Sequence, residues 1–463
     1  MSNTQEHNQF DQYIFLGIGG IGMSALARYL VIQGKTVLGY DRSATQITTD
    51  LTRLGVEITH QDHPVTGWFD PLSNVSTVIV WTPAVAQSDP WMIAARDSEF
   101  PMIKRAQLLG QVSAESGTVL AIAGTHGKTT TSAILSHLLA QAGKSSIGFL
   151  GGVAQNYETN LILSPTSESA LRARKAADFC VVEADEFDRS FLWIKPDYAC
   201  VTSVDPDHLD VYTNRESFEK VFEEFVEQLQ SKNLLIAEDL KFDGVRVGRT
   251  DLAQIKAESV EIIHGAYRFN IKFPDSQWDD LIGPLPGEHN LQNVLMAIGL
   301  ARQCGLTRKE VLSGLSNFKG IHRRFNQYEL TRGRVLIDDY AHHPTELKAL
   351  LQGVNEFYPD RSHTLVFQPH LYSRTRDFAE DFAQVLNQFD EVLIMPIYPA
   401  REEPIHGIDS RWLADMCDKS TVKFMSISQV LTTFKESDSS IFIVAGAGDI
   451  GLQVNRLTQI LNT

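Results

Sequence analysis

A glycine-rich loop with the sequence GTHGKTTT, at Gly124–Thr131, constrains the fold of this chain more than any other feature. It follows an apolar segment, Thr118–Ala123, that is typical of a buried strand, and a stretch with helical spacing comes after it. In such loops, backbone N–H groups cradle phosphates, the lysine neutralises their charge and the adjacent hydroxyl binds Mg²⁺. The loop therefore predicts an ATP site on an α/β sheet, with Lys128 on the phosphates and Thr129 on the metal.

The match to the general phosphate-loop pattern GxxxxGK is incomplete, because Ile122 stands where that pattern has its first glycine. The shorter form GxxGKT still joins a strand to a helix, so we keep the prediction of a phosphate site. The residues of the loop that we expect to contact ATP are Gly124, Thr125, His126, Gly127, Lys128, Thr129 and Thr130.

Short apolar segments alternate with helical stretches along the whole chain, which is typical of parallel sheets. The expected fold class is α/β with three domains. These are a Rossmann-like N-terminal domain at 1–117, a central domain like the P-loop ATPases at 118–324 and a Rossmann-like C-terminal domain at 325–463. The expected strands include Tyr13–Leu16, Thr36–Tyr40, Thr77–Trp81, Thr118–Ala123, Phe179–Glu183, Tyr198–Ser203, Val335–Ile337, Thr364–Phe367, Glu391–Met395 and Ile441–Val444.

The charge balance limits the partners of the chain. A formal net charge of −16 argues against a general binder of nucleic acids or anionic membranes, both of which need a basic surface. The first residues are polar and no apolar run is long enough to span a membrane. The four cysteines are well separated in sequence and form no CxxC pair, so we expect a cytoplasmic protein.

A second glycine-rich turn, Gly17-x-Gly19-x-x-Gly22, lies between the first expected strand and helix. Such a turn lets a pyrophosphate approach the start of the helix, and Asp41 stands where an acid would bind ribose. The sequence favours a nucleotide diphosphate as ligand. A nicotinamide cofactor and a purely structural turn remain as alternatives.

The central segment carries two further candidate groups. Glu183 ends one expected strand and His208 ends or follows another, both at the edge that carries the phosphate loop, so they are candidate metal ligands; a solvated acidic loop is the alternative. Asn290 and Asn293 lie on one face of an expected helix and could contact adenine, although Asn290 could instead cap that helix. Arg324 is placed to reach a phosphate from the domain boundary, unless it belongs to an exposed linker.

Two polar loops follow successive strands along the C-terminal domain, at 338–346 and 368–376. They contribute acids, imidazoles and two guanidinium groups to one edge of a sheet. An acid for an ammonium and an arginine for a carboxylate suit a small zwitterion, such as an amino acid. A network of surface ion pairs is the alternative.

The order of these motifs along the chain resembles the Mur ligase family. The resemblance extends from FLGIGGIGMS to IVAGAGDIG and rests on GTHGKTT, the EADE loop, the DH pair, GEHNxxN and DDYAHHPTE. It implies that the first glycine-rich turn binds a UDP-sugar, and that Asn290, Asn293 and Arg324 contact ATP. It also implies Mg²⁺ at Glu183 and His208. The residues implied for the UDP-sugar are Gly17, Gly19, Gly20, Gly22 and Asp41.

The resemblance also implies a reaction. ATP would activate the lactyl carboxylate of UDP-N-acetylmuramate as an acyl phosphate, and L-alanine would attack it, in the synthesis of a peptidoglycan precursor. The implied catalytic residues are Lys128, His208, Asp339 and His343, and the amino acid would contact His370, Arg374 and Arg376. Leu371 departs from the pattern, because relatives often carry arginine there, and this places the amino-acid carboxylate on Arg374. The alternatives are a ligase that attaches recycled murein tripeptide to the same sugar and, more remotely, a nicotinamide oxidoreductase.

Overall fold

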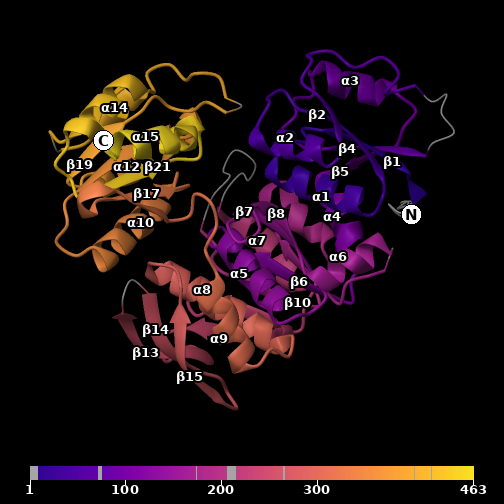
Figure 1. Cartoon of the computed structure of the whole chain (residues 1–463), viewed down its shortest axis with the longest axis horizontal. Coiled ribbons are helices and arrows are strands. Elements are labelled where there is room, and N and C mark those ends of the chain that lie inside the picture. The colour runs from indigo at the N-terminus through magenta and orange to yellow at the C-terminus, as the bar shows by residue number, and fades with distance from the viewer. Residues whose placement is uncertain are drawn as a thin grey trace. The chain divides into compact units, whose positions relative to one another are not determined.

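The computed structural model describes residues 9–70, 76–173, 175–205, 215–263, 266–400, 402–418 and 420–462. The chain divides into two compact units. Figure 1 labels the helices and strands along the chain. The first unit comprises residues 1–261, 268–284 and 292–319, and the second comprises 262–267, 285–291 and 320–463. Within the described residues, the strands form three sheets.

The first sheet has five parallel strands in the order β3-β2-β1-β4-β5. The strand order reverses beside β1, and the carboxyl ends next to such a reversal are where open α/β sheets bind ligands. The strands are β1 Gln12–Leu16, β2 Thr36–Tyr40, β3 Glu57–Thr59, β4 Thr77–Trp81 and β5 Met102–Lys104. The helices are α1 Ile21–Ile32, α2 Gln46–Arg53, α3 Pro90–Asp97 and α4 Arg105–Ser113.

The second sheet has ten strands in the order β15-β14-β13-β12-β11-β10-β6-β9-β7-β8. β6 (Thr118–Ala123) lies inside the sheet, parallel to β9 and β10, and its carboxyl end leads through the phosphate loop into α5 (Lys128–Gln141). The other strands are β7 Ser146–Ala154, β8 Thr159–Leu163, β9 Phe179–Glu183, β10 Tyr198–Val201, β11 Leu234–Ala237, β12 Val245–Gly248, β13 Ile255–Ile263, β14 Ala266–Lys272 and β15 Gln277–Gly283. The remaining helices are α6 Pro165–Arg172, α7 Arg215–Val226, α8 Glu288–Gln303, α9 Arg308–Asn317 and the 3₁₀ helices η2 Phe187–Trp193 and η3 Ser231–Asn233.

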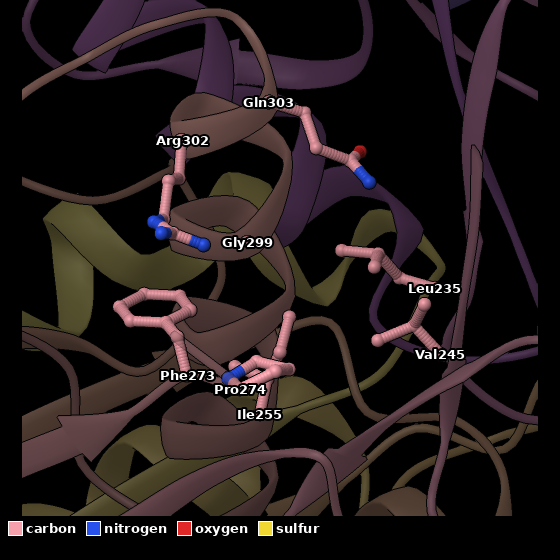
Figure 2. A pocket seen from close by; sticks show the side chains of 8 residues that line it. All are labelled: Leu235, Val245, Ile255, Phe273, Pro274, Gly299, Arg302 and Gln303. Atoms are coloured by element: carbon pink, nitrogen blue, oxygen red, sulfur yellow. The ribbon is translucent and has the colours of Figure 1, made fainter. Parts of the chain in front are cut away.

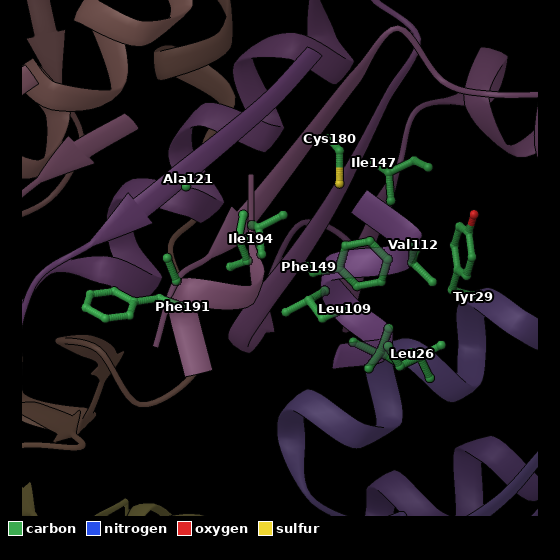
Figure 3. Close-up of a cluster of buried hydrophobic side chains, with 14 of the residues drawn as sticks. Leu26, Tyr29, Leu109, Val112, Ala121, Ile147, Phe149, Cys180, Phe191 and Ile194 are labelled. Carbon is green, nitrogen blue, oxygen red and sulfur yellow. The ribbon is translucent and has the colours of Figure 1, made fainter. Parts of the chain in front are cut away.

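The first two sheets share one hydrophobic core, which explains why they form a single compact unit. Side chains of α1 and α4 pack against strands of the second sheet, as Figure 3 shows. The rings of Tyr29 and Phe149 lie 5.6 Å apart. A buried polar contact joins the same elements, since the Asn160 amide donates to the Ser24 hydroxyl at 2.9 Å and also to the carbonyl of Ile21. A glycine turn of the first sheet and the phosphate loop of the second therefore belong to one packed body.

The second unit contains the third sheet, with six strands in the order β16-β17-β21-β18-β19-β20. β17, β18 and β21 run parallel, so the loops that follow β17 and β18 lie at the same edge, as predicted. The strands are β16 Asn326–Glu329, β17 Val335–Asp339, β18 His363–Phe367, β19 Glu391–Ile394, β20 Val422–Phe424 and β21 Ile441–Ala445. The helices are η4 Thr331–Gly333, α10 Pro344–Phe357, α11 Tyr372–Asp377, α12 Ala379–Leu386, α13 Ser410–Asp415, α14 Ile427–Glu436, η5 Asp449–Gln453 and α15 Val454–Leu461.

The ten strands named above as predictions from the sequence are all present, with ends that differ by at most two residues. In the part of the chain that the structure describes, no helix is both long and apolar enough to cross a membrane.

Candidate active site

The phosphate loop is held in a conformation that needs its two glycines. Gly124 has φ of 130° and Gly127 has φ of 84°, both in the left-handed region that favours glycine. A Cβ on Gly124 would lie 2.2 Å from the Thr202 hydroxyl, and one on Gly127 would lie 2.3 Å from Asn293 Oδ1. The loop is therefore packed tightly against the residues that directly follow β10 and against α8, and no larger residue fits at either position.

Lys128, the first residue of α5, is held by protein groups in this structure. Its ammonium lies 2.6 Å from Glu186 Oε2 and donates to the carbonyls of Gly124 at 2.5 Å and Thr125 at 3.3 Å. The side chains are 12% exposed for Lys128 and 1% for Glu186. Burial lowers the pKa of Lys128, but the carboxylates of Glu186 and Asp185 outweigh it, so the net shift is upward and the lysine stays charged.

Thr129 and Glu183, two of the three predicted metal ligands, lie within hydrogen-bond distance of each other. The Thr129 hydroxyl donates to Glu183 Oε1 at 3.0 Å, and the Gly151 N–H donates to Oε2 at 2.7 Å. Burial raises the pKa of Glu183, and the nearby Lys128 charge opposes that rise. A carboxylate and a hydroxyl are hard oxygen donors of the kind Mg²⁺ prefers. Among the described residues no group of three metal-binding side chains occurs, and His208 lies outside them.

The acidic loop that follows β9 contains Asp185, Glu186 and Asp188, and its central residue Glu186 is buried, so the alternative of a solvated loop does not hold there. Glu186 is buried against Lys128, and the carboxylate of Asp188 lies 2.7 Å from the Lys104 ammonium. Asp188 and Arg189 have φ of 52° and 56°, which is costly for residues other than glycine. Sequence reasoning grouped these acids but gave Glu186 no partner, because that lysine is 58 residues away.

Two other residues of the phosphate loop, Thr125 and His126, contact the segment that follows the carboxyl end of β10. The His126 N–H donates to the Ser203 hydroxyl at 2.9 Å, and its ring lies 3.6 Å from Asp205. The Thr125 hydroxyl donates to the Asp205 carbonyl at 2.9 Å. Thr130 is buried. These contacts fix the phosphate loop against the residues that directly follow β10.

The two asparagines of α8 have different surroundings. Asn290 lies in the first turn of a helix that begins at Glu288, so the alternative of an N-cap residue is wrong. Its amide donates to the Pro286 carbonyl at 2.6 Å within the second unit. Asn293 belongs to the first unit, where its carbonyl oxygen lies against Gly127.

The glycine-rich turn after β1 closes on itself and on β2. Gly17 has φ of 86°, and its N–H and that of Ile18 donate to the Tyr40 carbonyl at 2.8 and 3.0 Å. The Gly19 N–H donates to Asp41 Oδ2 at 2.8 Å, and the Gly20 N–H donates to the Gly17 carbonyl at 3.1 Å. The predicted ribose-binding acid thus also holds the turn. Gly22 lies in the first turn of α1, beneath the side chain of Arg105.

In the second unit, Asp339 and His343 are fixed by the backbone. Asp339 accepts the N–H groups of Phe325 at 2.7 Å and Ala341 at 2.8 Å, one at each carboxylate oxygen. Burial raises its pKa to about 6, against the opposing charge of Arg324. His343 caps α10, where its Nδ1 accepts the Thr345 N–H at 3.4 Å.

The two polar loops of the third sheet do meet. The rings of His342 and His370 lie 5.7 Å apart, and Arg374 Nη1 lies 3.5 Å from His370 Nδ1. Arg374 is buried, whereas Arg376 is half exposed and pairs with Asp377.

Arg324 and Leu371 lie beside these loops in the second unit. Arg324 lies 3.8 Å from Glu346 and over the ring of Tyr340, so it is no free linker residue. Leu371 is buried with φ of 71°, a strained backbone for a branched residue that the sequence did not reveal.

A separate cavity of about 310 Å³ lies in the first unit, between α8 and β11–β13 (Figure 2). The guanidinium of Arg302 lies over the Phe273 ring and pairs with Asp275 at 2.6 Å. None of the predicted site residues lines this cavity, so it is not part of the candidate active site. Its lining is Leu235, Val245, Ile255, Phe273, Pro274, Gly299, Arg302 and Gln303.

A phosphate loop on one sheet, packed in the same body as a glycine-rich turn at the switch point of another, is the arrangement of a nucleotide-using α/β protein. The chain matches three family models in series: "Mur ligase family, catalytic domain" at residues 12–116, "Mur ligase middle domain" at 122–301 and "Mur ligase, glutamate ligase domain" at 323–448.

Curated relatives match this chain over nearly its whole length. A UDP-N-acetylmuramate–L-alanine ligase of Flavobacterium psychrophilum is 42% identical over 98% of this chain and 99% of its own, and one of Flavobacterium johnsoniae is 43% identical over 98% and 99%. The crystal structure of the UDP-N-acetylmuramate–alanine ligase MurC of Thermotoga maritima superposes with a TM-score of 0.79 at 26% identity, over 97% of this chain and 98% of that one. The chain belongs to the Mur ligase family, and the α/β class with three domains predicted from the sequence is confirmed.

Proposed function

We propose that this protein is an ATP-dependent ligase that joins L-alanine to the lactyl carboxylate of UDP-N-acetylmuramate, in the synthesis of a peptidoglycan precursor. The observation that carries the proposal is the phosphate loop with its lysine and its Thr129–Glu183 pair, on a chain whose full length matches ligases named for this reaction. The activity inferred from the sequence agrees with those names. The proposed domains are 1–117 for the UDP-sugar, 118–324 for ATP and 325–463 for the amino acid. The use of ATP implies a cytoplasmic reaction.

The first step transfers a phosphoryl group. A lactyl carboxylate oxygen attacks the γ-phosphate, the bond to the β-phosphate oxygen breaks, and acyl phosphate and ADP form. Lys128, at the start of α5, neutralises charge on the transferred group. Its ammonium must then exchange at least one of its protein contacts for a phosphate oxygen, because three acceptors already surround it.

The second step forms the amide. The amine of L-alanine attacks the acyl carbon, and phosphate leaves from the tetrahedral intermediate. A base must remove a proton from the ammonium of the amino acid. We favour His343 over Asp339 as this base, because two backbone N–H groups already hold the two carboxylate oxygens of Asp339. Arg374 with His370 would bind the amino-acid carboxylate.

Magnesium fits the donor set of the phosphate loop. The Thr129 hydroxyl and the Glu183 carboxylate would hold the ion, and we include His208 as a third proposed ligand. When bound, the ion would neutralise charge on the phosphates of ATP.

Replacing Glu183 with glutamine should weaken metal binding. A neutral amide keeps the size of the side chain but loses the charge that attracts the cation, so we expect the half-saturating metal concentration to rise about tenfold or more. Mn²⁺ binding in the presence of a non-hydrolysable ATP analogue, followed by electron paramagnetic resonance, measures this directly. An unchanged Mn²⁺ affinity would remove Glu183 from the metal site.

Replacing Glu186 with glutamine should strengthen the binding of ATP, whereas the Glu183 variant should weaken the binding of metal. The buried carboxylate competes with phosphate for the Lys128 ammonium, so its neutral analogue is expected to tighten ATP binding several-fold. Calorimetric titration with the non-hydrolysable analogue tests this. Weaker binding would mean that Glu186 orients the lysine and does not compete for it.

The function itself is tested by phosphate release from purified protein. Release should require ATP, Mg²⁺, UDP-N-acetylmuramate and L-alanine together. Release with murein tripeptide in place of L-alanine would favour the recycling ligase, and a change in reduced-nicotinamide absorbance would favour an oxidoreductase.

A further inference from the structure

The glycine-rich turn after β1 leaves little of its backbone for a ligand. The N–H groups of Gly17 and Ile18 donate to the Tyr40 carbonyl, that of Gly19 donates to Asp41, and that of Gly20 donates to Gly17. Four consecutive N–H groups are therefore used within the protein. A carboxylate, Asp41, lies at the same turn and opposes a bound anion. The N–H groups of the first turn of α1 remain for a bound anion. A cation from elsewhere in the chain would add to them in binding a doubly charged diphosphate.

Arg105 is the cation that the fold brings to this turn. It directly follows β5, whose last residue Lys104 pairs with Trp81, and Trp81 in turn pairs with Leu16 at the end of β1. The three strands are parallel, so Arg105 and the glycine-rich turn begin at the same level of the same sheet edge. That edge, next to the reversal of strand order, is where α/β sheets bind ligands.

The guanidinium of Arg105 lies against the first turn of α1. A Cβ added to Gly22 would come within 2.8 Å of Arg105 Nη1 and 3.2 Å of its Cδ, so Gly22 makes the room that this side chain occupies. In the usual dinucleotide-binding turn the third glycine allows the helix to pack on a strand. Here its neighbour is a cation.

Arg105 has capacity to bind an anion. Its side chain is 19% exposed, so its charge is only partly screened by water. The carboxylate that it faces, Asp185, is 3.5 Å away, longer than a charge-assisted bond of 2.7–2.9 Å. A diphosphate oxygen could therefore replace Asp185 without breaking a strong contact.

We propose that Arg105 is a substrate-binding residue that holds the diphosphate of the UDP-sugar over the first turn of α1, with Gly22 as the position that admits its guanidinium. The proposal rests on the function proposed above. It assigns the recognition of the diphosphate charge to Arg105, the first residue of α4, which directly follows β5 and is distant from Gly22 in sequence.

The test uses UDP as the probe, because UDP carries the diphosphate and lacks the lactyl carboxylate. Calorimetry with Arg105→Ala should show a loss of UDP affinity of about ten- to hundredfold, the value of a charge-assisted hydrogen bond, with UDP-N-acetylmuramate weakened equally. Affinity for the ATP analogue should stay unchanged. Gly22→Ala, which keeps the arginine but displaces it, should weaken UDP in the same direction. Arg172→Ala removes an exposed arginine of α6 paired with Glu168 and should change neither affinity.

The outcomes separate the two proposals. If the unaltered protein binds UDP and Arg105→Ala binds it equally well, the assignment of Arg105 is wrong and the function stands. If Arg105→Ala loses only UDP-N-acetylmuramate and keeps UDP, the cation serves the carboxylate and the diphosphate assignment is wrong. If the unaltered protein binds neither, both proposals fall. Arg105→Lys keeps the charge and should bind UDP more tightly than Arg105→Ala but less tightly than the unaltered protein. If the alanine variant does not fold, weaker UDP binding by Arg105→Lys than by the unaltered protein supports the assignment, and equal binding contradicts it.

Discussion

Replacing Lys128 with alanine is expected to lower the rate of phosphate release by about 10³-fold or more. Phosphoryl transfer depends on positioned positive charge, and Lys128 is the cation placed at the start of the helix that follows the phosphate loop. The side chain is mostly buried, so water screens its charge poorly and the lost interaction is correspondingly large. The measurement is phosphate release with all substrates saturating.

The Lys128→Ala variant is also expected to lose stability, and a second substitution provides the control for that loss. Alanine at 128 leaves Glu186 buried without its cation, which costs about 3–5 kcal/mol of stability for a buried pair broken on one side. A fall in activity could then reflect unfolding. The double variant Lys128→Ala, Glu186→Gln removes the stranded charge and should recover most of the thermal stability while remaining inactive. Activity of the double variant within tenfold of the unaltered protein would contradict the role of Lys128.

Replacing Asp338 with asparagine is expected to change the stability of the second unit and the dependence of that stability on pH. Asp338, in β17, is 3% exposed, and its nearest cation, Arg323, is 3.7 Å away. Burial raises its pKa to about 7, and the neighbouring Asp339 adds to the rise, while Arg323 opposes it. We expect Asp338→Asn to raise the free energy of unfolding at pH 8 by about 2–4 kcal/mol, since about 3 pKa units correspond to roughly 4 kcal/mol.

The sign follows from the pKa difference between the two states. The folded state holds the proton more tightly than the unfolded chain, so the unfolding free energy falls as pH rises from about 4 to about 7 and is flat above that. Asparagine cannot ionise, so the variant should lose this slope and keep only the smaller one from Asp339, below about pH 6. Near pH 4 the two proteins should be almost equally stable.

Hydrogen exchange of the amides of β17 and β21, compared at pH 4.5 and pH 8 and corrected for the intrinsic exchange rates, reports the stability of this sheet. Asp338→Asn should gain protection at the higher pH only. If the variant loses protection at pH 8, the Arg323–Asp338 pair is a net stabilising ion pair and burial does not dominate the energy of Asp338. An equal change at both pH values would show that the side chain acts through packing and not through its charge.

The sequence by itself determined the strands and the order of the motifs. Segments such as Thr118–Ala123 and Phe179–Glu183 are short, apolar and bounded by turn residues, and their preference for a buried strand is local. The glycines of the phosphate loop were equally visible as a motif, and the structure gives both Gly124 and Gly127 a positive φ. These features depend on neighbours in the chain, so a single sequence is enough to find them.

Only the tertiary structure decided which charges meet. Three contacts join residues that are distant in sequence: Lys128 with Glu186, Arg105 against Gly22, and the Phe325 N–H with Asp339. Such contacts depend on the order of strands in a sheet and on the direction of each side chain, and neither leaves a periodic pattern in the sequence. The motifs thus predicted candidate phosphate sites, whereas the packing of the sheets decided which cation faces which carboxylate.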